Sequence, residues 1–175
     1  MYCTPTHLAA AKLARELAQV ATPERHRIVA DDLMEATLRD EDRSQFDPDE
    51  ILVADEALAV ISTALVDADG VIDGYLVMRK PVAYKVPLNP VPGIVSTWAR
   101  WIARYLLHKD RVNTQERTDP VVRDYQQAIK FLELTRDGKF SLGVDDPLPP
   151  AGGGAPEWCA PERQFSGRTL RDYGE

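Results

Sequence analysis

The chain has 175 residues, of which 44% are hydrophobic and 28% are charged, a composition that argues against a disordered or a membrane protein. Its net charge of −7 argues against a protein that coats nucleic acid by neutralising phosphates. No apolar run approaches the length of a spanning helix, and the first residues carry no export signal. Cys3 and Cys159 fit no metal-ligand spacing, so we expect free thiols in a reducing compartment.

Prolines that follow a capping residue mark helix starts in the first half of the chain. Thr4-Pro5 predicts a short helix that extends toward Val20, and Thr22-Pro23 predicts a second helix that extends toward Leu38. Asp47-Pro48 is the strongest signal and predicts a long helix. Its apolar residues recur in steps of three and four, a stripe that requires a helical partner: Ile51, Ala54, Leu58, Ile61, Leu65, Ala68, Ile72 and Tyr75.

The acidic residues are concentrated where the second predicted helix ends and the long helix begins. Between positions 31 and 56 there are eleven acidic residues against Arg39 and Arg43, a local charge of −9 that leaves about +2 for the rest of the chain. Asp31, Asp32 and Glu35 lie close enough in sequence to bind a divalent cation, but we interpret them as a solvated helical face.

Four prolines in the sequence KPVAYKVPLNPVP predict a rigid, non-helical connector after the long helix. A helix is then predicted from about Ile94 to Lys109, with an aromatic face and a basic face that continues to Arg111. Asp119-Pro120 predicts the last helix, which Gly138 ends. Four aromatic residues of these two helices are expected in the core: Trp98, Trp101, Tyr105 and Tyr125.

These patterns predict an all-α fold, a small bundle of about four helices over residues 1–143. A Pro/Gly-rich linker follows at residues 144–156, and residues 157–175 form an extended C-terminal arm. The arm combines aromatic residues with arginines, which are enriched at interface hot spots. We therefore expect the arm to bind a partner.

We find no pattern of catalytic residues in the sequence. The histidines fall on separate predicted helices, the serines lack a nucleophile-elbow context, and the glycines of the linker lack the strand and lysine of a phosphate loop. We expect a protein that is not an enzyme, with no catalytic residues, no cofactor and no metal. Two alternatives stay open: a small DNA-binding regulator that uses the basic helix 94–111, and a metal-dependent enzyme built on the acidic cluster.

Three blocks of the sequence resemble the head-tail connector proteins of Mu-like tailed bacteriophages, which are also called adaptor or head-completion proteins. The first is ALAVISTALVDADGVIDGYLVMRKPV, with its IDGYL box before the proline-rich connector. The second is IARYLLHKDR followed by VVRDYQQAIKFLELTRDGKFSLG, which closes on a GK turn. The third is the terminal APERQFSGRTLRDYGE. The blocks keep the family's order from about Ala57 to the C-terminus.

The resemblance implies a structural virion protein, made in the bacterial host cytoplasm, that assembles as a ring at the head-tail interface, typically of twelve copies. The ring would lie below the portal protein and extend the channel, through which genome DNA passes without sequence-specific binding. The body would contact a tail-side connector, a stopper or the tail terminator. We expect no membrane partner. The expected portal anchors are Trp158, Arg163, Phe165, Arg168, Leu170, Arg171 and Tyr173, and the expected subunit-interface residues are Arg100, Arg104 and Arg111.

Overall fold

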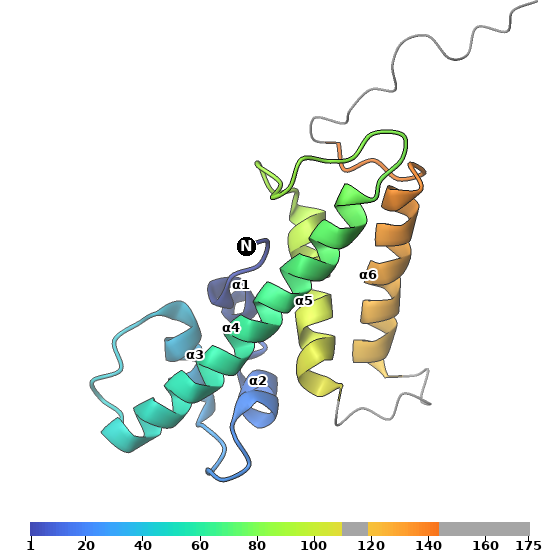
Figure 1. Cartoon of the computed structure of the whole chain (residues 1–175). Helices are drawn as coiled ribbons and strands as arrows, with labels where there is room; N and C mark the ends of the chain where they lie inside the picture. The colour runs from blue at the N-terminus through green and yellow to red at the C-terminus, as the bar shows by residue number, and fades with distance from the viewer. Residues whose placement is uncertain (110–118, 144–175) are drawn as a thin grey trace, which may run out of the picture.

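A computed structural model describes residues 1–109 and 119–143, and within them the chain forms six helices and no strand (Figure 1). The predicted all-α class is confirmed for these residues. The predicted number of about four helices is too low, because the chain before the long helix forms three short helices. The predicted linker and arm lie outside the described residues.

Helix α4 (Pro48–Val77) is the longest element, and most of the other helices pack along it (Figure 1). Asp47 caps it as predicted, because the Asp47 side chain accepts a hydrogen bond from the backbone N–H of Asp49 at 2.8 Å. The predicted apolar stripe is the buried face, with Ile61, Leu65 and Ile72 fully buried. No helix in the described residues is long and apolar enough to cross a membrane.

Helices α5 (Gly93–His108) and α6 (Pro120–Arg136) pack against the C-terminal half of α4 (Figure 1). Trp98 is buried as predicted and stacks on Phe131, with ring centroids 5.9 Å apart. Tyr105 and Tyr125 stack at 4.0 Å but are only partly buried, as is Trp101. Of the four aromatic residues expected in the core, only Trp98 is therefore fully enclosed.

The short N-terminal helices differ from the sequence prediction. One helix was expected after Thr4-Pro5, but the chain forms α1 (Pro5–Ala10) and α2 (Ala14–Ala21), because Lys12 adopts a left-handed backbone conformation that breaks the helix. Thr22 does not begin a helix. Its hydroxyl donates to the Ala18 carbonyl at 2.5 Å and so closes α2, while α3 (Asp31–Arg39) begins nine residues later.

The proline-rich connector between α4 and α5, residues 78–92, is non-helical as predicted and folds over the end of α6. The Lys80 N–H donates to the Arg136 carbonyl at 2.9 Å, and the Leu142 N–H donates to the Tyr84 hydroxyl at 3.2 Å. Gly138 has a φ of 71°, and a Cβ at this position would lie 2.6 Å from the Lys80 carbonyl oxygen. The GK turn therefore requires glycine where the connector crosses it.

Candidate functional site

The residues that the sequence predicts for portal binding all belong to the C-terminal arm and lie outside the described residues, as does Arg111. Their roles therefore stay predictions. The other two residues predicted for a subunit interface, Arg100 and Arg104, both lie on α5, and the structure places them in different surroundings.

Arg104 joins three helices of the same chain. Its guanidinium donates hydrogen bonds to both carboxylate oxygens of Glu16 on α2, with Nη2 2.7 Å from Oε2, and its Nη1 lies 3.9 Å from Asp124 Oδ2 on α6. The hydrogen bond to Glu16 raises the pKa of Arg104. His108 Nε2 lies 3.3 Å from Glu16 Oε1. Arg104 therefore pairs within one chain in this structure, and its role at a subunit interface stays a prediction.

Arg100 lines an open depression of about 380 Å³ together with Cys3 and His7. Cys3 is fully buried, and this burial raises the pKa of its thiol to about 11. Because the thiolate is the nucleophilic form, Cys3 is not an activated nucleophile at neutral pH. His7 serves the cap of α1, where its Nδ1 accepts a hydrogen bond from the Thr4 N–H at 3.3 Å. The depression therefore does not combine a histidine with an activated cysteine.

Some of the carboxylates of the acidic segment pair with arginines. Glu35 accepts a hydrogen bond from Arg39 at 2.7 Å, Glu56 accepts one from Arg25 at 2.7 Å, and Arg43 pairs with Asp55. In the part of the chain that the structure describes, no group of three or more His, Cys, Asp or Glu side chains is placed to hold a metal ion. The acidic cluster is therefore a charged surface in this structure.

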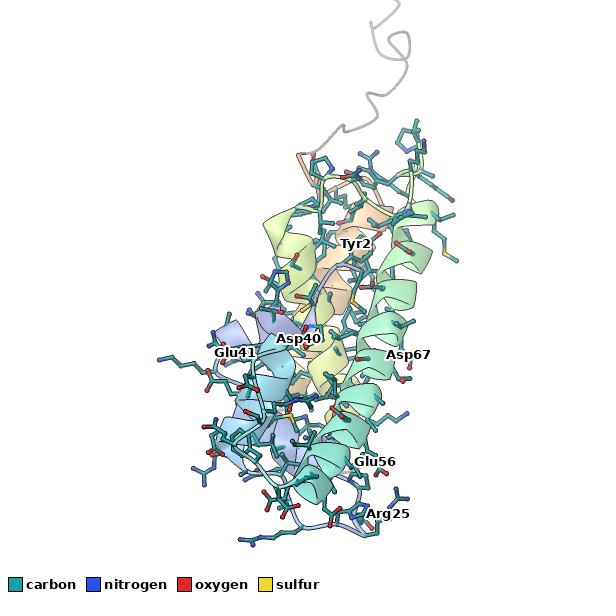
Figure 2. All side chains as sticks on the ribbon, turned by 90° about the vertical axis from the view of Figure 1, so that its left-hand side faces the viewer. Tyr2, Arg25, Asp40, Glu41, Glu56 and Asp67 are labelled. Carbon is teal, nitrogen blue, oxygen red and sulfur yellow. The ribbon has the colours of Figure 1, made fainter. Side chains whose placement is uncertain are left out.

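We call residues 26–56 the acidic end. They comprise the first turns of α4 and the residues before it, which include α3. The segment has eleven acidic residues against Arg27, Arg39 and Arg43, a net charge of −8. Figure 2 shows Glu56 and Arg25 near the bottom of the molecule, and Asp40 and Glu41 higher, about level with Asp67 of α4. All eleven carboxylate residues are exposed.

The acidic end also contains a groove that is partly apolar and partly charged. It has a volume of about 290 Å³ and lies between the segment 26–30 and the first turns of α4. Its lining combines apolar, basic and acidic residues: Ile28, Val29, Ala30, Val53, His26, Arg27, Asp49 and Glu50. Ile28 is 55% exposed, and Leu52, which precedes Val53 in the sequence, is 64% exposed. These side chains leave apolar surface in water beside negative charge.

We call residues 78–94 and 136–143 the basic end. They contain five lysines and arginines against Asp137, a net charge of +4, and lie at the C-terminal end of α4 (Figure 1). Lys80, Lys85 and Lys139 are exposed. Arg79 is buried, with its guanidinium 4.5 Å from the centroid of the Tyr84 ring. The surface charge of this end therefore comes mainly from its lysines.

The basic end carries exposed apolar side chains as well. Met78 is 65% exposed, and three more large apolar residues of the connector and of the first turn of α5 are exposed: Val82, Val91 and Ile94. The prolines prevent a helix in the connector. Without a helical repeat, the sequence pattern gives no indication of which of its apolar side chains are exposed.

The outward face of α4 connects the two ends and is apolar in part. Val60, Val66 and Val77 are exposed there, outside the stripe that the sequence analysis recognised. A Cβ added at Gly70 or Gly74 would meet no atom of the chain within 4 Å, so close packing within the chain does not require glycine at either position. The sequence shows that this helix has apolar residues outside its core-facing stripe, and this pattern could have predicted a binding surface on its outward face.

Comparison with known proteins identifies relatives of this chain. The family model described as "Bacteriophage Mu, Gp36" matches residues 2–157. The "Mu-like prophage FluMu protein gp36" of Haemophilus influenzae is 40% identical over 88 residues, which are 50% of this chain and 56% of that protein. "Gene product J" of Escherichia phage Mu is 33% identical over 87 residues, 50% of this chain and 55% of that protein. The alignments thus span about half the length of these curated relatives, and no solved structure matches the chain.

Proposed function

The chain belongs to the bacteriophage Mu Gp36 family, and we propose that within this family it acts as a structural virion protein, a head-tail connector. In this proposal the protein forms a ring below the portal, extends the DNA channel and links the portal to the tail-side proteins. The observation that carries the proposal is the family match over residues 2–157, together with the resemblance of its motifs to head-tail connectors.

The surface of the described residues supports a binding role. Large apolar side chains are exposed at both ends of α4 and along its outward face, with Leu52 and Met78 more than 60% exposed. Exposed apolar surface of this kind is typical of contacts between proteins when it is gathered in patches. A ring subunit that contacts its neighbours, the portal and a tail-side protein requires several such surfaces.

The acidic end supports the proposed channel. Its excess of exposed carboxylates repels the phosphates of DNA, so that DNA slides past without binding. In the proposed ring this segment lies near the lumen. A ring structure in which residues 31–56 face outward would remove this part of the proposal.

The portal-binding role of the arm is tested by deleting residues 157–175 and measuring capture by the portal protein of the same phage. We expect the truncated chain to keep its helical circular dichroism and to lose portal binding. A Trp158→Ala/Phe165→Ala double variant should weaken capture at least tenfold, since aromatic anchors dominate such interfaces. Glu157→Ala is the matched control in the same arm, and undiminished capture of the truncated chain would refute the anchor assignment.

The alternative of a DNA-binding regulator depends on the basic face of α5. Arg104, the central residue of that face, is bound to Glu16 and Asp124 within the chain, which leaves less free positive charge for a DNA groove. The two functions differ in salt dependence. Strong duplex DNA binding that falls steeply with salt would favour the regulator, whereas the connector should bind duplex DNA weakly.

A further inference from the structure

We propose that the acidic end of one copy binds the basic end of a second copy, with the connector 78–92 of the second copy lying in the groove between residues 26–30 and α4. This inference rests on the proposed ring, because it names the surfaces through which neighbouring subunits make contact.

The two ends are complementary in charge. The acidic end has a net charge of −8 and the basic end a net charge of +4, and residues 78–94 include no acidic residue. At the acidic end the arginine pairs use only part of the negative charge, since Asp40, Glu41, Asp49 and Glu50 have no ion pair among the described residues. Charge of one sign on each surface favours binding between them and opposes binding of either end to itself.

The two ends are also alike in exposing apolar side chains beside their charges. The groove of the acidic end exposes Ile28, and the connector exposes Met78, Val82 and Val91. An interface core that is apolar and a rim that is charged is the usual arrangement of a protein-protein contact. The connector is therefore a chemically suitable occupant of the groove.

One copy cannot make this contact with itself. The ends are separated by α4, whose 30 residues at 1.5 Å per residue span about 45 Å. The connector is held over α6 by the hydrogen bond from Lys80 to Arg136 and by the close approach of Gly138. The contact is therefore between copies, and because it joins two different surfaces it is heterologous, the type that forms a ring when the rotation between neighbours closes and an open filament when it does not.

The test is sedimentation velocity of the full chain at low and at high salt. Lys80→Glu/Lys85→Glu reverses the charge of two residues and brings the net charge of the basic end from +4 to zero, and Asp49→Lys/Glu50→Lys reverses the charge of two residues that line the groove. We expect the wild-type chain to self-associate at low salt, and each reversal to weaken association at least tenfold. Arg123→Glu/Lys130→Glu on the exposed side of α6 is the matched control, which should associate as the wild type does.

Mixing the Lys80→Glu/Lys85→Glu variant with the Asp49→Lys/Glu50→Lys variant shows whether association was lost through the contact or through misfolding. Each variant keeps one natural end that fits a natural end of the other, so the mixture should regain association that neither variant shows alone. A wild-type chain that stays monomeric at low salt, reversals that do not weaken association, or a mixture that does not regain it would each overturn the inference. Binding of duplex DNA to the basic end of a monomeric chain would do the same.

Portal capture keeps this inference distinct from the proposed function. A monomeric chain that still binds the portal protein overturns the inference and leaves the connector function in place. A chain that self-associates through its two ends, as the reversals report, but does not bind the portal protein or enter particles supports the inference and removes the connector function.

Discussion

The two ends of α4 are held in different ways. At the basic end, buried side chains and specific hydrogen bonds fix the connector: Tyr84 and Leu88 are buried, and Gly138 admits the backbone of Lys80. At the acidic end, Leu33, Met34 and Leu38 are buried as well, and ion pairs such as Arg25 with Glu56 and Arg39 with Glu35 lie on the surface. Both ends therefore rest on packed side chains, and they differ in their polar contacts, which are specific hydrogen bonds at the basic end and ion pairs that salt screens at the acidic end.

The largest expected effect is at the aromatic cluster beside the basic end. Trp98 is 1% exposed and contacts the rings of Phe131 and Phe140. We expect Trp98→Ala to lower the free energy of unfolding by about 3 to 5 kcal/mol, because it leaves a cavity in the core. Urea denaturation measures this, with Leu52→Ala as the control at the acidic end, where we expect a change within about 0.5 kcal/mol. Equal losses in the free energy of unfolding for Trp98→Ala and Leu52→Ala would contradict this expected difference.

The next effect concerns the glycine below the connector. Gly138→Ala places a Cβ 2.6 Å from the Lys80 carbonyl oxygen at a positive φ, so we expect a loss of about 2 to 3 kcal/mol in the free energy of unfolding. Gly74→Ala is the matched control, because a Cβ there meets no atom of the chain and helix propensity should add about 0.5 to 1 kcal/mol. If Gly138→Ala left the free energy of unfolding unchanged, the connector would not be fixed by this turn.

A smaller effect is expected at Tyr2, which joins the N-terminus to the basic end. Its hydroxyl donates to Asp73 on α4 and accepts from the Leu88 N–H at 3.2 Å. We expect Tyr2→Phe to cost about 1 to 2 kcal/mol, because both partners lose a hydrogen bond.

The same residue predicts a pH dependence. Burial, followed by the hydrogen bond to Asp73, raises the pKa of Tyr2 above its ordinary value of 10.0. The folded state therefore holds this proton more tightly than the unfolded state, and the stability it contributes is complete below pH 10 and lost as the pH rises further. Thermal unfolding above pH 10 should show a steeper loss for the wild type than for Tyr2→Phe. Equal slopes would contradict the role of Tyr2.

The smallest effect is at the acidic end. Arg25 and Glu56 form an ion pair at 2.7 Å, but their side chains are 68% and 45% exposed. A double-mutant cycle of Arg25→Ala and Glu56→Ala should give a coupling of about 0.5 kcal/mol or less that disappears at high salt. A coupling above about 1 kcal/mol that persists in salt would mean that the acidic end is held as firmly as the basic end.

The sequence predicted the elements whose signals are local. Asp47-Pro48 and Asp119-Pro120 begin α4 and α6 as expected, because capping and proline geometry act within a few residues. The break at Lys12 was missed, since lysine rarely adopts the left-handed conformation and nothing in the sequence marks it. Thr22-Pro23 was misread because a threonine hydroxyl can also donate back to the preceding turn.

The candidate surfaces were predicted less well, because they depend on distant parts of the chain. Glu16 binds Arg104 across 88 positions, a pairing that spacing cannot show. The acidic segment was recognised from composition, but the groove beside it is formed by two segments that tertiary packing brings together. The exposure of the apolar connector residues, such as Met78 and Val91, could be determined only from the structure.

The most direct test of the connector function is cryo-electron microscopy of purified particles of the phage that encodes this chain. The account predicts a ring of this protein below the portal, with residues 157–175 laid along the portal protein and residues 31–56 toward the channel. Particles that contain no copy of the chain, together with tight binding of the purified chain to duplex DNA, would contradict it.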